Sequence, residues 1–177
     1  DVRKNIFTPL DDDSGGDLYA ITQSIMTDAG IAAYEISNHA RNGKQSRHNL
    51  TYWRYQDYAG IGPGAHGRRT RQATQRHKKP ENFLSAVARN GHGIKAEERL
   101  TAETQITEAL LVGLRLTEGI DINRLAGNFG KIPDEIVDRK AISRLSDLGL
   151  LTHTNGRLAI ATKGMPLLDA ILPEIIA

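Results

Sequence analysis

The stretch LLTHTNGRLAIAT at residues 150–162 predicts a β-hairpin. Asn155-Gly156 lies between two short apolar runs, and a type I′ turn needs positive φ at both central residues, which Asn and Gly tolerate. Gly149 directly precedes the hairpin and is a typical residue just beyond a helix end. The apolar residues of 133–148 have helical spacing, so we expect a helix there, followed at once by the hairpin.

Further helices are predicted on both sides of this pair. One opens at Thr101, a short one covers 121–127, and a last one starts near Pro166. Three helices, a hairpin and a helix form the order of a winged-helix domain, which we assign to residues 97–177. The apolar positions that mark the buried helix faces are Ile106, Leu110, Leu111, Leu114, Val137, Ala141, Leu145 and Leu148.

The first part of the chain, residues 1–67, predicts a helix followed by a strand. Ser14 can cap a helix that runs to about Ala29, with Gly30 as its stop. Its apolar face carries Leu18, Ile21 and Ile25. Residues 31–37, IAAYEIS, are partly β-branched and predict a strand. A helix followed by a strand after a short loop is half of a βαβ unit.

A basic segment comes next. Residues 67–80, GRRTRQATQRHKKP, contain six basic side chains and no acidic one. This pattern fits a solvated loop, and it equally fits a surface for an anionic ligand or partner. A short helix is expected over 81–90 with Pro80 in its first turn, so 68–96 is assigned as a basic loop and connecting helix.

Composition excludes several kinds of chemistry. The chain has 177 residues and no cysteine, so it forms no disulfide and holds no iron–sulfur cluster through its own thiolates. Its six histidines show no i, i+4 pair, which disfavours a zinc site. No run of about 18 apolar residues occurs, so no transmembrane helix is expected, and we predict a cytoplasmic location.

Three blocks are specific enough to indicate a family. YEISNHA (34–40), SRHNLTYW (46–53) and DYAGIGPGAHG (57–67) resemble the radical SAM family related to oxygen-independent coproporphyrinogen III oxidase, closest to its heme chaperone (HemW) branch. The resemblance implies an α+β fold: the last part of a partial (β/α) radical SAM barrel in 1–67, followed by a helical, winged-helix-like C-terminal domain in 97–177.

The family's cluster motif has no counterpart here. Its members hold a 4Fe–4S cluster on CxxxCxxC near the N-terminus, and the fourth iron takes the methionine end of S-adenosylmethionine (SAM). We therefore expect the cluster only in an upstream part that this sequence lacks, and no radical chemistry from this chain alone. Barrel strands would also be missing, so an exposed edge in 1–67 invites dimerisation.

The pattern HNxxYW is associated with heme binding in the heme chaperone branch. An imidazole is a good axial ligand for heme iron, and flat aromatic rings offer apolar area to a porphyrin face. Arg47 or Arg54 is placed to pair with heme propionates. A histidine before a Tyr-Trp pair is also commonly a hydrogen-bonded packing residue, and both interpretations stay open. The residues concerned are His48, as the iron ligand, with Asn49, Tyr52 and Trp53.

The glycines of GIGPGAHG (60–67) do not make a dinucleotide fingerprint, because Pro63 and a basic segment follow instead of a helix. They predict a close approach of the backbone to a ligand or to a neighbouring strand. By resemblance, Ala40 and His66 fall where related oxidases contact SAM. Glu35 and Asp57 flank these motifs, as an acid–base pair or as ordinary solvated or ion-paired carboxylates.

Three functions follow. The resemblance favours a heme chaperone that binds heme and SAM and passes heme to an acceptor protein. The alternative is oxidative decarboxylation of coproporphyrinogen III by the intact parent. A winged helix that binds DNA is a minor alternative, because residues 133–148 carry a formal net charge of −1, and a helix that enters a DNA groove should be basic. We therefore expect no nucleic-acid partner.

Overall fold

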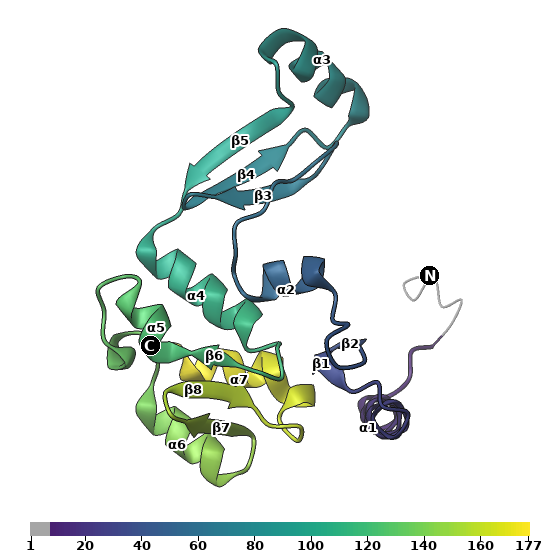
Figure 1. The fold of residues 1–177 in the computed structure, drawn as a ribbon, viewed down its shortest axis with the longest axis vertical. Helices are drawn as coiled ribbons and strands as arrows, with labels where there is room; N and C mark the ends of the chain where they lie inside the picture. The colour runs from purple at the N-terminus through teal and green to yellow at the C-terminus, as the bar shows by residue number, and fades with distance from the viewer. Residues whose placement is uncertain (1–7) are drawn as a thin grey trace. The chain divides into compact units, whose positions relative to one another are not determined.

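The computed structural model of the chain describes residues 8–177 (Figure 1). The chain divides into two compact units, Asp1–Gln45 and Ser46–Ala177, and each is described here by itself. Helices and antiparallel strand pairs are mixed in both units, and residues 8–177 contain no closed barrel. The domain boundaries predicted after residues 67 and 96 remain predictions.

In the first unit, helix α1 (Asp12–Asp28) is followed by strands β1 (Ala33–Glu35) and β2 (Asn38–His39). The helix begins earlier than predicted, because Asp11 is its cap and accepts a hydrogen bond of 2.8 Å from the backbone N–H of Ser14. The strand is shorter than predicted and pairs with β2 in an antiparallel hairpin. All strand pairs within residues 8–177 are antiparallel, so the parallel partner of a βαβ unit is not among them.

The predicted apolar face of α1 is exposed to solvent. None of the side chains of α1 is buried. Because burial of such a face supplies most of a helix's stability, α1 gains little from packing within the described residues. The large apolar side chains concerned are Leu18, Ile21 and Ile25, with exposed fractions of 52%, 54% and 62%.

The second unit begins with helix α2 (Arg47–Trp53), which the Ser46 side chain caps by accepting from the Asn49 N–H. The basic segment that follows is not a loop. Strands β3 (His66–Arg69) and β4 (Gln72–Arg76) form a hairpin, and β5 (Ile94–Arg99) pairs with β4 to complete a three-stranded sheet. The helix predicted over 81–90 is present as α3 (Pro80–Asn90), and it lies between β4 and β5 in sequence.

Helix α4 (Ala102–Gly113) starts after Thr101, whose side chain accepts from the Thr104 N–H at 3.1 Å, as the sequence predicted. Leu110 is fully buried. Leu111 was predicted to be buried and is 39% exposed, so the buried face is rotated away from it. The other side chains of α4 and its end that are buried are Gln105, Ile106, Ala109 and Leu114.

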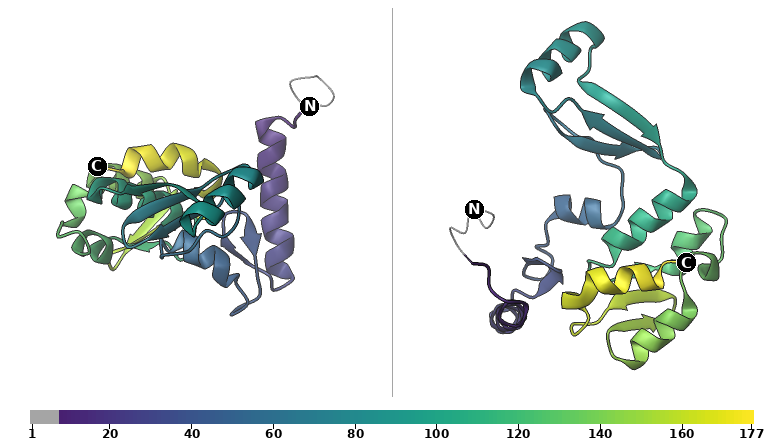
Figure 2. Two further views of the ribbon diagram at one scale, coloured as in Figure 1. Left: turned by 90° about the horizontal axis from the view of Figure 1, so that it is seen from above. Right: turned by 180° about the vertical axis from the view of Figure 1, so that it is seen from behind.

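The predicted hairpin is present. Asn155 and Gly156 have φ values of 53° and 77°, as a type I′ turn requires. The hairpin joins a third strand in the order β6–β8–β7, and Figures 1 and 2 show the last helix, α7, across one face of this sheet. The elements are β6 (Ile120–Asp121), α5 (Ile122–Gly127), α6 (Arg139–Asp147), β7 (Leu151–Thr154), β8 (Arg157–Ile160) and α7 (Leu168–Ile175), with 3₁₀ turns at Pro133–Glu135 and Met165–Leu167.

The helix predicted over 133–148 is shorter than expected. A 3₁₀ turn covers Pro133–Glu135, Val137 forms a β-bridge to Ile176, and α6 starts only after Asp138. The Asp138 carboxylate caps α6 by accepting from two backbone N–H groups, and these hydrogen bonds lower its pKa. The last predicted core position, Leu148, is 55% exposed.

This shorter helix changes the charge argument against DNA binding. Asp134 and Glu135 lie outside α6, which itself carries three basic side chains and one acidic one. The predicted net charge of −1 therefore does not describe the helix. Two of the basic side chains are already ion-paired, Arg139 with Asp134 and Arg144 with Glu174.

Candidate functional site

Helix α2 presents the predicted iron ligand on one face. His48 and Tyr52 are four residues apart, so their side chains are neighbours. The Tyr52 hydroxyl and His48 Nε2 share a hydrogen bond of 3.0 Å, and the ring centroids are 4.6 Å apart at an interplanar angle of 85°. Tyr58 extends the cluster, with its ring centroid 4.4 Å from that of Tyr52. His48 is exposed, at the end of a row of three rings.

The hydrogen bond to Tyr52 sets what His48 can bind. When Nε2 carries the proton and donates to the tyrosine oxygen, Nδ1 keeps its lone pair. Within residues 8–177, Nδ1 of His48 has no hydrogen-bond partner in the structure. In this tautomer the imidazole has one nitrogen available to a metal ion, and the hydrogen bond to Tyr52 orients the ring.

Asn49 and Trp53 lie on a different face of α2. The guanidinium of Arg115 is 4.7 Å from the Trp53 ring centroid, a cation–π distance. Trp53 Nε1 is buried and has no hydrogen-bond partner in the described part of the chain. The four residues predicted to contact heme thus share one short helix but divide between two of its faces, with His48 and Tyr52 on one and Asn49 and Trp53 on the other.

Arg54, one of the two candidates for a heme propionate, is already paired. Its Nε and Nη2 donate to the two carboxylate oxygens of Glu118 at 2.8 and 2.9 Å. The hydrogen bond from Arg54 lowers the pKa of Glu118, and the same bond raises the pKa of Arg54. The other candidate, Arg47, is exposed at the first position of α2.

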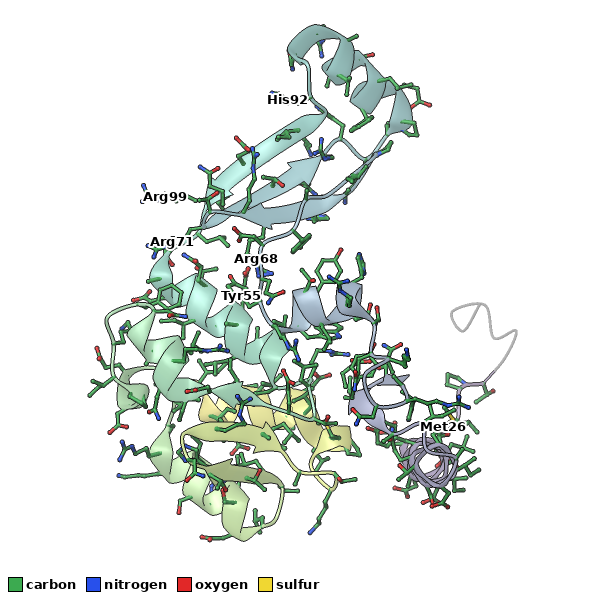
Figure 3. The ribbon with its side chains drawn as sticks, viewed as in Figure 1. Met26, Tyr55, Arg68, Arg71, His92 and Arg99 are labelled. Atoms are coloured by element: carbon green, nitrogen blue, oxygen red, sulfur yellow. The ribbon has the colours of Figure 1, made fainter. Side chains whose placement is uncertain are left out.

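A second cluster was not foreseen from the sequence. The guanidinium carbon of Arg68 lies 3.5 Å from the Tyr55 ring centroid, and Figure 3 shows the two side chains next to each other. The Tyr55 hydroxyl donates to Glu108 Oε2 at 2.5 Å. Burial, and then this hydrogen bond, raise the pKa of Tyr55. The three residues come from separate segments, so only the folded chain brings them together.

Arg68 is short of partners. Its side chain is only 12% exposed, and its Nε and Nη1 atoms are buried without a hydrogen-bond acceptor among residues 8–177. The nearest carboxylate oxygen, Glu108 Oε2, is 3.9 Å from Nη1, too far for a hydrogen bond. Buried polar atoms are normally satisfied, so this guanidinium is suited to an acceptor that the protein does not supply.

Two cavities meet at this cluster. The larger has a volume of about 820 Å³ and is bordered by Trp53 and by several arginines. The smaller, about 330 Å³, lies beside β3 and α4 and is bordered by His66 and Tyr58. Tyr55 and Arg68 border both.

The predicted SAM contacts lie in different units. Ala40 follows β2 and donates its backbone N–H to the Ala32 carbonyl at 3.0 Å. His66 starts β3, is exposed, and borders the smaller cavity.

The two carboxylates of the same motifs each have a local structural role. Glu35 is fully buried, and its Oε1 accepts from the Ser37 N–H at 2.9 Å inside the β1–β2 turn. Asp57 Oδ2 accepts from the Thr70 N–H at 2.9 Å. These bonds favour the structural alternative over an acid–base pair.

The glycine run allows close backbone packing. A Cβ on Gly60 would lie 2.2 Å from the carbonyl oxygen of His66, and one on Gly67 would lie 2.8 Å from the backbone nitrogen of Gly60. Of the two predicted reasons for these glycines, the structure supports the approach to a neighbouring strand. Across residues 8–177, no group of three or more His, Cys, Asp or Glu side chains is arranged to hold a metal ion.

Comparisons with known proteins agree on one family. Residues 100–167 match the HemN C-terminal domain. Radical S-adenosyl methionine domain-containing protein 1, mitochondrial, of Mus musculus is 34% identical over 97% of this chain and 41% of its own length. Heme chaperone HemW of Bacillus subtilis is 32% identical over 84% of this chain and 39% of its own length.

A solved structure gives the same result for the fold. The coproporphyrinogen III oxidase HemN from Escherichia coli, described as a radical SAM enzyme, matches with a TM-score of 0.67 over 89% of this chain and 39% of its own. At 17% identity this likeness concerns the fold alone. The chain belongs to the HemN-like radical SAM family. Within that family it falls in the HemW branch, and it spans about two fifths of the length of these relatives.

Proposed function

We propose that the chain is the C-terminal portion of a radical SAM porphyrin-handling protein, a heme chaperone that binds heme and SAM. In this proposal residues 1–67 contribute the last part of a partial barrel, 68–96 connect, and 97–177 form a winged-helix-like domain. Heme is the cargo, and an acceptor protein receives it.

The observation that carries the proposal is the arrangement around His48. The exposed imidazole of His48 is hydrogen-bonded to Tyr52 and offers a nitrogen to heme iron. The rings of Tyr52 and Tyr58 contact each other beside it and offer apolar area to the porphyrin. Two relatives are named heme chaperone HemW, and this name supports heme as the ligand that carries the iron.

SAM and the cluster belong to the intact parent in this proposal. Ala40 and His66 are proposed to contact SAM, and an upstream CxxxCxxC segment is proposed to hold the 4Fe–4S cluster. His66 beside the smaller cavity supports a ligand contact at that position. The chain itself has no cysteine for a cluster.

The oxidase activity remains the alternative, and the match of residues 100–167 to the HemN C-terminal domain supports it. DNA binding by α6 has weaker support, because Arg139 and Arg144 are engaged in ion pairs.

No helix within residues 8–177 is long and apolar enough to cross a membrane. A cytoplasmic location is a proposal, since some relatives are named as mitochondrial. Dimerisation through an exposed edge is likewise a proposal.

The test is a hemin titration of the wild-type chain and of His48→Ala, followed in the Soret region. We expect His48→Ala to shift the Soret band and to weaken binding by about tenfold or more, because it removes an iron ligand. His153→Ala is the matched control, since His153 is an exposed histidine on β7, away from α2. An unchanged spectrum and affinity for His48→Ala would overturn the ligand assignment and strengthen the oxidase alternative.

A further inference from the structure

The larger cavity has the size of a ligand site. Its volume of about 820 Å³ lies within the range of small-molecule pockets, and it is formed entirely by the 46–177 unit. Trp53, Tyr55 and Phe129 supply aromatic area to its wall. These three rings are an apolar part of a mostly polar wall, and they offer a surface on which a flat ring can stack.

The acidic and basic side chains that line the cavity differ in how many are free to bind a ligand. Each of the three carboxylates accepts at least one hydrogen bond from within the fold. Asp57 accepts from the Thr70 N–H, Glu118 from Arg54, and Asp121 from the Arg124 N–H at the start of α5.

The arginines are five, and three of them remain available. Arg54 is bound to Glu118, and Arg157 donates to the backbone carbonyls of Glu118 and Gly119. Arg68, Arg71 and Arg124 make no hydrogen bond through their guanidinium groups to any acceptor in residues 8–177. The cavity therefore offers more cationic donors than anionic acceptors.

Arg68 is the most deeply buried of the available arginines and indicates where an anionic group would bind. Its buried Nε and Nη1 atoms lack acceptors, and a buried donor left unsatisfied costs free energy. The Tyr55 ring holds the guanidinium at the junction of the two cavities. Figure 3 shows Arg71 at the same end of the β3–β4–β5 sheet, whereas His92 lies at the other end.

We propose that this cavity binds the carboxylate edge of a flat apolar ligand, with Arg68 as the buried anchor and Arg71 and Arg124 as its exposed partners. The proposal rests on the proposed function and deepens it. A porphyrin is a flat apolar ring with two propionates, so the cavity arginines bind these propionates instead of Arg54, which Glu118 occupies.

The test uses metal-free protoporphyrin IX and its dimethyl ester, which has the same ring but no free carboxylate. Trp53 is the single tryptophan of the chain and borders the cavity, so quenching of its fluorescence reports binding. We expect the free acid to bind the wild-type chain about tenfold more tightly than the ester, as charge-assisted hydrogen bonds to arginine predict.

Variants then locate the carboxylates. Arg71→Gln and Arg124→Gln change exposed side chains, and we expect each to weaken binding of the free acid by about twofold to threefold, a part of the tenfold preference, and to leave the ester unchanged. Arg68→Gln should remove most of the preference for the acid. Arg69→Gln is the control, because Arg69 is the next residue of β3 but is 62% exposed and bound to Glu97.

Equal affinity for the acid and the ester would overturn the proposal, as would unchanged acid binding in the Arg71→Gln Arg124→Gln double variant. If Arg68→Gln does not fold, the Arg71→Gln and Arg124→Gln variants still test whether the cavity binds the carboxylates. If the wild-type chain binds the acid and the ester equally but shows a His48-dependent Soret shift with hemin, the cavity proposal is wrong and iron ligation stands. If the wild-type chain prefers the acid but shows no His48-dependent Soret shift, iron ligation is wrong and the cavity proposal stands.

Discussion

Breaking the ion pair between Arg54 and Glu118 should lower the stability of the 46–177 unit by a modest amount that depends on pH. The pair joins the residue that ends α2 to the segment after α4 through two hydrogen bonds of 2.8 and 2.9 Å. Two unit charges at 2.8 Å attract each other by about 1.5 kcal/mol in a water-like dielectric. Both side chains are almost half exposed, at 44% and 45%, so screening and side-chain entropy reduce this figure to about 1 kcal/mol or less.

The pH dependence has a defined sign. The hydrogen bond from Arg54 holds the pKa of Glu118 below its ordinary value of 4.5 in the folded chain. A carboxyl group whose folded pKa is lowered contributes stability above its unfolded pKa and loses that contribution as pH falls through the folded pKa. The Arg54–Glu118 coupling should therefore be complete at about pH 7 and should decline below about pH 4.5.

A double-mutant cycle measures this coupling. Urea unfolding of wild type, Arg54→Met, Glu118→Gln and the double variant gives the interaction energy separately from other losses. The Arg69–Glu97 pair provides a matched comparison, because it has a single contact of 3.3 Å and should couple less. A coupling near zero at neutral pH, or one that is equally large at about pH 3, would refute the reasoning.

Three further predictions concern the fold of the same unit. Gly67→Ala should destabilise it by about 1–3 kcal/mol, because the new Cβ would lie 2.7 Å from Thr74 Oγ1. Gly127→Ala is the control, since its Cβ would lie in open space and should cost little, and thermal melts compare the two variants. Asp138→Ala should cost about 1 kcal/mol through the lost cap of α6, and urea midpoints that match wild type would contradict the cap. Leu110→Ala should cost about 2–5 kcal/mol and Leu111→Ala under about 1, so equal losses in denaturant unfolding would contradict the observed buried face.

Local signals predicted the parts of the fold that local physics determines. The β7–β8 turn follows from Asn155-Gly156, because few other pairs adopt positive φ at both positions. Thr101 predicted the start of α4 because its side chain satisfies a free backbone N–H. Helical spacing alone misled at Val137, which has the right period for α6 but forms a bridge to Ile176. Periodicity does not reveal such a pairing with a residue near the chain end.

The basic segment shows what the sequence could not provide. Its hairpin turns through Thr70 and Arg71, both with positive φ, and neither residue type is a typical turn signal for that conformation. Its other partner, β5, lies beyond a helix in sequence. The Arg68–Tyr55 contact depends on this sheet, so the cavity arginines could be counted from the sequence but not located. His48 and Tyr52, in contrast, are neighbours by helical spacing alone once α2 is known.

The position of Ser46 has a consequence for how this segment can be inherited or engineered. Ser46 is the first residue of the second unit and also the cap of the helix that carries His48. The capping residue Ser46 and the HNLTYW motif therefore belong to the same unit, and the first turn of α2 needs no capping group from the preceding unit. A gene fusion or recombination event with its junction just before Ser46 would transfer the HNLTYW helix with its own initiation signal. A junction one residue later would leave the helix to find a new cap in each host.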